Sequence, residues 1–282
     1  MQVRLAEHLG MCFGVRDAID LALDLTSQGP LTILGDLVHN PDVVAQIDAA
    51  GAVRVQRPED IGTPSVLLTA HGVADRVRLE LRQRGLAVHD ATCPLVIRAH
   101  RALARLAAEG RHVVVIGQPK HVEVRGLVGD FDEYTIVQNE ADLDHLAERI
   151  ERQPDLRLGV VAQTTQPLER VQELIEAMRR RLPNTDIRFI DTVCQPTKDR
   201  QQALRDLAAE TDVVIVVGGP ESNNSRKLVE LARSLGRPAY LVTSAEELRP
   251  EWFINCSLVG LTAGTSTPDA IIGEVQAWLE KH

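Results

Sequence analysis

The sequence predicts an α/β protein made of three copies of one unit, each with a parallel sheet. Two observations lead to this prediction. Short apolar runs alternate with segments of helical periodicity, which is typical of buried parallel strands joined by helices. Cysteines also recur at one position of a long repeat, at Cys12, Cys93 and Cys194. A fixed long period of this kind indicates a repeated supersecondary unit.

The first half of each copy is a cysteine, a helical segment and an apolar run that ends on a glycine. The glycine follows the cysteine by 23 or 24 residues in every copy. The expected helices are 15–29, 94–110 and 195–210, and the expected strands end at Gly35, Gly117 and Gly218. A polar side chain follows four residues after each glycine, at His39, His121 and Ser222.

The second half of each copy is a short strand, an acidic turn and another apolar run. The turns are 55–61, 137–143 and 242–248, and the closing runs end in polar residues that include His71, Thr164 and Ser266. We therefore expect three α/β lobes of roughly 90 residues, with boundaries at 1–92, 93–193 and 194–282. The turn D-x-x-C before Cys93 and Cys194 places these thiols at strand carboxyl ends, where ligand crevices form.

The net charge and the length of the apolar runs limit the kinds of partner that the protein can bind. The net charge of −9 argues against nucleic acid, since phosphate neutralisation needs a basic face. There is no apolar run long enough to span a bilayer and no secretory signal, so we expect a cytoplasmic protein without a membrane partner. A small anionic ligand remains possible, because it needs only a local donor-rich pocket.

The repeated cysteines are candidate metal ligands. If the copies surround a pseudo-threefold axis, Cys12, Cys93 and Cys194 converge, and three thiolates leave one iron of a cubane cluster open for substrate. Buried structural thiols are the competing interpretation, and a zinc site with three protein ligands is another. Cys256 has no counterpart in the other copies and is expected to be structural.

The polar strand ends form a second candidate set, suited to a phosphate or diphosphate. Its members all follow apolar runs: His39, His71, His121, Thr164, Ser222, Asn224 and Ser266. Any one of them alone is more simply a satisfied structural group. Glu123, two residues beyond His121, is a candidate proton donor, although most glutamates are surface groups.

With these residues in view, the chain resembles the 4-hydroxy-3-methylbut-2-enyl diphosphate reductases of the non-mevalonate isoprenoid pathway. The motifs that carry the resemblance run in the family's order from residue 10 to 268: GMCFGV, LVHNPDVV, TAHGV, DATCPLV, KHVEVRGLVG, AQTTQ, DTVCQPTKDRQ, SNNSRKL and GLTAGTSTP. The resemblance implies a three-lobed α/β trefoil around a [4Fe–4S] cluster, held by Cys12, Cys93 and Cys194.

The resemblance also assigns roles to the polar residues. The substrate diphosphate would be held by His39, His71, His121, Ser222, Asn223, Asn224 and Ser266, with Thr164 beside them. Glu123 and Thr164, with His121, would form the catalytic proton relay. The electrons would come from an external donor such as ferredoxin or flavodoxin. An iron–sulfur redox sensor and a reductase or dehydratase of another allylic diphosphate remain alternative functions.

Two positions depart from the family's usual pattern. Val122 stands where a proline is usual, so a fixed φ is lost between His121 and Glu123. Asn223 stands where a serine or glycine is usual. These departures bear on loop rigidity and on one phosphate contact.

Overall fold

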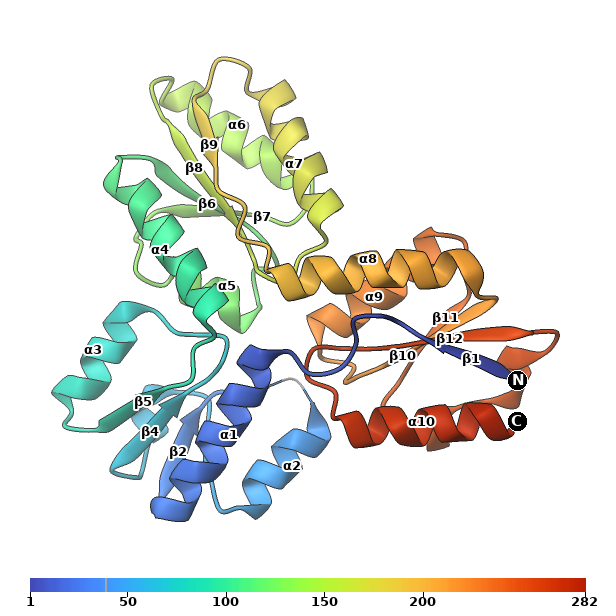
Figure 1. The fold of residues 1–282 in the computed structure, drawn as a ribbon. Helices are drawn as coiled ribbons and strands as arrows, with labels where there is room; N and C mark the ends of the chain where they lie inside the picture. The colour runs from blue at the N-terminus through green and yellow to red at the C-terminus, as the bar shows by residue number, and fades with distance from the viewer. Residues whose placement is uncertain (39) are drawn as a thin grey trace. The chain divides into compact units, whose positions relative to one another are not determined.

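The computed structural model describes residues 1–38 and 40–282, which form three four-stranded sheets flanked by helices (Figure 1). Every strand pair in this described part of the chain is parallel. The predicted α/β class with three parallel sheets is confirmed. His39 lies outside the described residues.

The strands follow one order in all three sheets. The first sheet has the order β3 (Val53–Val55), β2 (Leu31–Leu34), β4 (Ser65–Leu68), β5 (Ala87–Asp90). The second has β7 (Tyr134–Val137), β6 (His112–Ile116), β8 (Leu158–Ala162), β9 (Ile187–Phe189). The third has β11 (Ala239–Val242), β10 (Val213–Val217), β12 (Leu258–Ala263), β1 (Gln2–Leu5).

The helices also recur by position. The helices that begin at the repeated cysteines are α1 (Phe13–Gln28), α4 (Pro94–Ala108) and α8 (Gln195–Glu210). The central strands lead into α2 (Pro41–Ala49), α5 (Val122–Val128) and α9 (Asn223–Ser234). The next strands lead into α3 (Asp75–Gln83), α7 (Leu168–Arg181) and α10 (Asp269–Lys281). The remaining elements are α6 (Asp142–Arg152) and the 3₁₀ helices Pro58–Asp60, Ala245–Glu247 and Pro250–Phe253.

The strands β2, β6 and β10 are buried along their whole length because helices cover both faces of each sheet. All residues of β2, β6 and β10 are buried. In the second sheet, Leu174 and Met178 of α7 pack with Val114 and Val160 of the strands. Because the strands of each sheet are parallel, their carboxyl ends lie at the same edge of the sheet. The polar residues of the candidate site follow these strand ends.

The strand β1 was not among the expected elements. It pairs with β12 at the edge of the third sheet, and three of its four residues are exposed. The edge strands β5 and β9 lead into the cysteine turns of Cys93 and Cys194, and β1 precedes Cys12 in the same way. The boundaries 1–92, 93–193 and 194–282 stay a prediction, although residues 2–5 share a sheet with strands from the C-terminal part.

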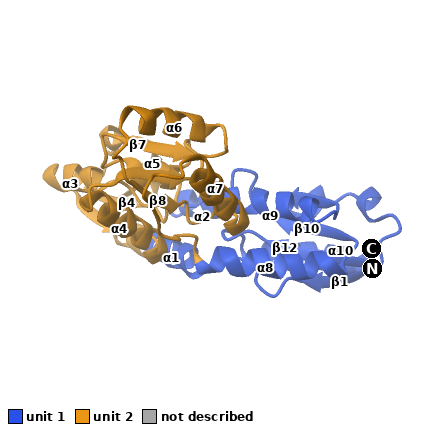
Figure 2. Ribbon diagram, turned by 90° about the horizontal axis from the view of Figure 1, so that it is seen from above, with its two compact units in different colours: residues 1–23, 38–50, 195–282 blue, residues 24–37, 51–194 orange. Residues whose placement is uncertain are grey.

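The contacts divide the chain into two compact units (Figure 2). Unit 1 comprises residues 1–23, 38–50 and 195–282, and unit 2 comprises residues 24–37 and 51–194. Within the described residues, no helix has the length and apolar character that crossing a membrane requires.

Candidate functional site

Cys93 and Cys194 lie in turns of identical design in unit 2. Asp90 Oδ1 accepts the N–H of Thr92 at 2.9 Å, and Asp191 Oδ1 accepts the N–H of Val193 at 3.0 Å. A short carboxylate that bonds the backbone two residues ahead closes a turn, which explains the D-x-x-C pattern. The fold therefore uses the aspartate to shape the loop that presents the thiol.

Each repeated cysteine is tied to the end of a neighbouring strand by its own N–H. Cys93 donates to Ala70 O at 3.0 Å and Cys194 donates to Thr164 O at 3.0 Å. In unit 1, Cys12 donates to Thr265 O at 3.2 Å. The turn before Cys12 has no aspartate, and Gly10 supplies a positive φ of 75° there.

The three thiols share a position at the start of a helix. The carbonyls of Cys12 and Cys93 accept N–H groups in the first turns of α1 and α4, and Cys194 directly precedes α8. A helix N-terminus stabilises negative charge nearby, which suits an anionic ligand. All three thiols are half-buried, as is that of Cys256.

The structure does not bring the three thiols together within one unit. Cys12 belongs to unit 1, whereas Cys93 and Cys194 belong to unit 2. Neither unit, over its described residues, gathers three His, Cys, Asp or Glu side chains at metal-ligand distances. The convergence of the thiols stays a prediction.

Glu123 is a buried acid held by Thr164. It lies in the first turn of α5 and is 2% exposed. Its Oε1 accepts the N–H of Thr164 at 2.6 Å and its Oε2 accepts the hydroxyl of Thr164 at 2.9 Å. Burial raises the pKa of Glu123 to about 7, against the opposing effect of the Thr164 hydrogen bonds. A carboxyl group with such a pKa can deliver a proton near neutral pH.

His121 and His71 lie together, and His121 bonds to the backbone of this acid. Their rings are 5.7 Å apart between centroids, in an edge-to-face arrangement at 78°. His121 caps α5, where its Nδ1 accepts the N–H of Glu123 at 3.2 Å. That bond places the proton of a neutral His121 ring on Nε2. Val122, which replaces the usual proline, occupies the first position of α5. Proline is favoured at this position, because the N–H that it lacks would have no partner within the helix.

In unit 1 the start of α9 offers a concentration of hydrogen-bond donors. Ser222 caps the helix and accepts the N–H of Ser225 at 3.3 Å, and Asn223 and Asn224 form the first turn. Asn224 is 4% exposed, and its buried amide nitrogen has no hydrogen-bond partner among the described residues. Donors at a helix N-terminus bind anions, and an orphaned buried amide fits a ligand that supplies an acceptor. Ser266 is also buried in this unit.

Two of the three polar residues that lie four after a glycine have a shared structural role. His121 and Ser222 are both N-caps of the helix that follows the central strand. In the first copy the N-cap is Asn40, whose Oδ1 accepts the N–H groups of Asp42 and Val43. The prediction for His39 falls on the residue that the structure leaves undescribed.

One correspondence in the repeat was wrong by a residue. The cysteine N–H bonds make Thr164 the counterpart of Ala70 and Thr265, so the counterpart of His71 and Ser266 is Thr165. The hydroxyl of Thr165 accepts a hydrogen bond from Gln163 Nε2 at 3.2 Å. Thr165 therefore joins the candidate diphosphate residues, and the strand-end register could have identified it from the sequence.

Sequence reasoning also missed Arg200, which it treated as part of an ordinary helix. Arg200 is 5% exposed and donates to Gly10 O at 2.5 Å and Pro196 O at 3.0 Å. It lines, with Cys12, a cavity of about 320 Å³ in unit 1. The guanidinium thus fixes the loop that carries Cys12, and no periodic or spacing signal marks it.

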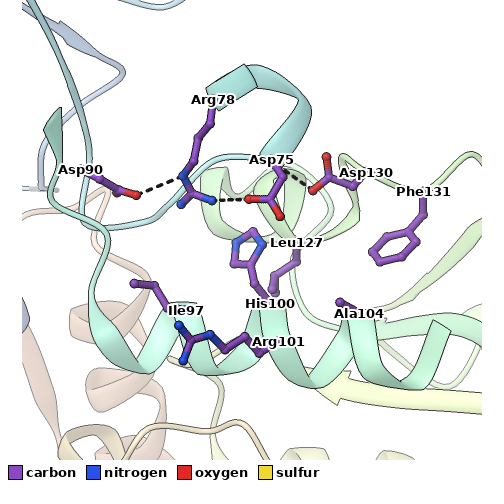
Figure 3. Close-up of a pocket in the computed structure, with 10 residues that line it drawn as sticks. All are labelled: Asp75, Arg78, Asp90, Ile97, His100, Arg101, Ala104, Leu127, Asp130 and Phe131. Carbon is purple, nitrogen blue, oxygen red and sulfur yellow. Dashed lines mark hydrogen bonds and ion pairs between the residues drawn. The ribbon is translucent and has the colours of Figure 1, made fainter. Parts of the chain in front are cut away.

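A cavity of about 630 Å³ in unit 2 lies outside the candidate residues (Figure 3). Its charged groups pair with one another, since Arg78 donates to Asp75 at 2.6 Å and to Asp90 at 3.0 Å. Burial and the nearby Arg78 lower the pKa of His100 on its wall. Because Asp90 closes the Cys93 turn, this pairing supports the turn.

Comparisons with known proteins agree on one family. The family model described as LytB protein matches residues 3–280. A 4-hydroxy-3-methylbut-2-enyl diphosphate reductase of Chromohalobacter salexigens is 40% identical over 100% of this chain and 89% of its own length. That of Methylibium petroleiphilum is 41% identical over 97% of this chain and 83% of its own.

Solved structures give the same result. The E-1-hydroxy-2-methyl-but-2-enyl-4-diphosphate reductase of Plasmodium falciparum matches with a TM-score of 0.90 and 26% identity, over 99% of this chain and 87% of that one. A second solved structure, described as the terminal enzyme of the non-mevalonate pathway, matches with a TM-score of 0.70 and 35% identity over 100% of both chains.

Proposed function

The chain belongs to the LytB protein family, and we propose from this premise that it reduces 4-hydroxy-3-methylbut-2-enyl diphosphate. The reaction replaces the carbon–oxygen bond of the allylic hydroxyl with a carbon–hydrogen bond. Two electrons and two protons enter, and the hydroxyl leaves as water. The products are isopentenyl and dimethylallyl diphosphate, according to which end of the allylic unit takes the proton. An external donor protein, such as a ferredoxin or flavodoxin, supplies the electrons.

The cysteines fit a [4Fe–4S] cluster by their chemistry. Cys12, Cys93 and Cys194 are half-buried thiols at equivalent positions before helix N-termini, which suits anionic ligands. They would hold three irons of the cluster. When bound, the cluster supplies the electrons and a Lewis-acidic iron without a protein ligand. The protein's own residues bind the diphosphate and handle the protons.

The diphosphate-binding residues lie at the strand ends of both units. In unit 1 the donors are Ser222, Asn223 and Asn224 at the start of α9, with Ser266. In unit 2 they are His71, His121 and Thr165. His39 is the remaining member and keeps its assignment from the sequence. The orphaned amide nitrogen of Asn224 supports a ligand rich in acceptor oxygens.

Glu123 carries the mechanistic part of the proposal. Hydroxide leaves poorly, so the departing oxygen needs a proton from an acid that is protonated near neutral pH. Glu123 has the required pKa of about 7 because it is buried. Thr164 fixes both carboxyl oxygens, and its hydroxyl is placed to relay the proton. His121, with its Nδ1 occupied as a helix cap, presents Nε2–H to the substrate.

The experiment that tests this function uses the anaerobically purified protein with its metal content measured. Protein reduced by dithionite and a viologen dye should consume the allylic diphosphate, and chromatography should detect both isopentenyl and dimethylallyl diphosphate. A protein with an intact cluster that leaves the substrate unchanged would contradict the proposal and favour a redox sensor. Turnover of a different allylic diphosphate alone would reassign the substrate.

A further inference from the structure

The helix α5 lies unusually close to the turn that follows β4, within unit 2. A Cβ atom at Gly126 would lie 3.1 Å from Gly72 O, 3.4 Å from Gly72 C and 3.5 Å from the Cα of Val73. All three are backbone atoms, so no side-chain rotation could relieve the crowding. Gly126 is therefore glycine because two backbones meet at this point.

A second glycine continues the same contact one turn later. A Cβ at Gly129 would lie 2.7 Å from the Cβ of Ala74 and 3.0 Å from Arg125 O. Residues three apart share one face of a helix, so Gly126 and Gly129 form one smooth surface against 72–74. Gly126 and Gly129 both have φ values open to other residues, since neither φ is positive. Space, and not backbone conformation, accounts for both glycines.

Glycine inside a helix is less favourable than alanine, because it loses more backbone freedom. The helix α5 has only 7 residues, so an unfavourable residue within it weighs more than it would in a long helix. Gly273 in α10 provides a contrast, because no atom lies within 4 Å of the position its Cβ would take. An alanine at Gly273 meets nothing, whereas one at Gly126 must push the helix away from the turn.

The two sides of this contact carry the histidines of the candidate site. His71 directly precedes Gly72, and His121 caps the first turn of α5. The 5.7 Å separation of their rings is therefore set by how closely α5 approaches the turn. We propose that Gly126 and Gly129 are positioning residues. They set the distance between His71 and His121, the two histidines that bind the substrate diphosphate. This inference rests on the proposed function.

The test compares Gly126→Ala and Gly129→Ala with the wild-type protein. Calorimetry should show that inorganic diphosphate binds about tenfold or more weakly, as expected when a hydrogen bond to a charged group is lost. The KM for the allylic substrate should rise in parallel, while the iron content and the cluster spectrum stay unchanged. The matched control, Gly273→Ala, should retain wild-type affinity and KM.

A compensating variant separates positioning from general destabilisation. Ala74→Gly removes the methyl that Gly129→Ala would meet, so the double variant should regain most of the diphosphate affinity. Wild-type affinity and KM in a folded Gly126→Ala protein would overturn the inference. If Gly126→Ala fails to fold, the comparison of Gly129→Ala with the double variant tests the inference instead. A double variant that binds diphosphate no better than Gly129→Ala would overturn the inference. If calorimetry detects no binding of inorganic diphosphate to the wild-type protein, both the proposed substrate and this inference are contradicted.

Discussion

At the scale of single residues, Glu123 is the group whose environment most clearly specifies chemistry. Glu123→Gln keeps the shape of the side chain and an acceptor for Thr164 N–H but removes the acidic proton. We expect turnover to fall by about 10²–10⁴-fold, the usual contribution of general acid catalysis. The cluster spectrum should stay normal. Steady-state kinetics on anaerobic protein measures the effect, and near-wild-type turnover would leave His121 as the next candidate donor.

The raised pKa of Glu123 predicts how activity depends on pH. Burial raises this pKa to about 7, so the carboxyl is protonated below pH 7 and ionised above it. Turnover should fall as pH rises through 7, by about tenfold per unit once the acid is mostly ionised. By linkage, the raised pKa contributes stability at low pH, which is lost as pH rises through 7. A kcat profile that stays flat from pH 6 to 9 would exclude Glu123 as the acid.

At the scale of elements, the recurring feature is a helix N-terminus after each central strand. The caps are Asn40, His121 and Ser222, so the same supersecondary position supplies a polar side chain in each copy. Anions bind such termini through backbone N–H groups and through cap side chains. The polar cap follows the strand's glycine by four or five residues, because a buried strand gives way to a helix at this position in each copy.

The start of α9 separates side-chain from backbone contributions to diphosphate binding. Ser222→Ala and Asn224→Ala should each weaken binding by about 1–3 kcal/mol, because each removes a bond to a charged group. Asn223→Ser should change activity only modestly, since the backbone N–H of residue 223 is retained. Calorimetric titration with inorganic diphosphate compares the three variants. A loss in Asn223→Ser as large as in Asn224→Ala would show that the Asn223 side chain has its own role.

Much of this architecture could be predicted from sequence, for identifiable reasons. The buried strand β10 is a continuous apolar run, β6 is apolar after His112, and the cysteines mark the repeat. The strand β1 escaped prediction because it is short, mostly exposed and paired with a strand over 250 residues away. Arg200 escaped because its burial depends on Gly10, which is 190 residues distant. Contacts of this range leave no local pattern in the sequence.

At the scale of the whole molecule, the three repeated cysteines occupy equivalent positions in their copies, each directly before a helix, but they belong to two different units. Ser in place of Cys12, Cys93 or Cys194 should sharply reduce the iron and sulfide content, since thiolate is the ligand that iron prefers in such clusters. Cys256→Ser is the matched control, because Cys256 packs with the core of the third sheet and bonds to Trp252 O. Its cluster content should equal the wild type. Loss of the cluster in Cys256→Ser alone would overturn the ligand assignment.

The central claim is that three cysteines hold a four-iron cluster, so that one iron has no protein ligand and can respond to substrate. Mössbauer spectroscopy of the ⁵⁷Fe-enriched protein tests it most directly, with and without the allylic diphosphate. We expect four irons, of which one gives a distinct signal that changes when substrate is added. A spectrum in which all irons are equivalent and unaffected by substrate would contradict this account.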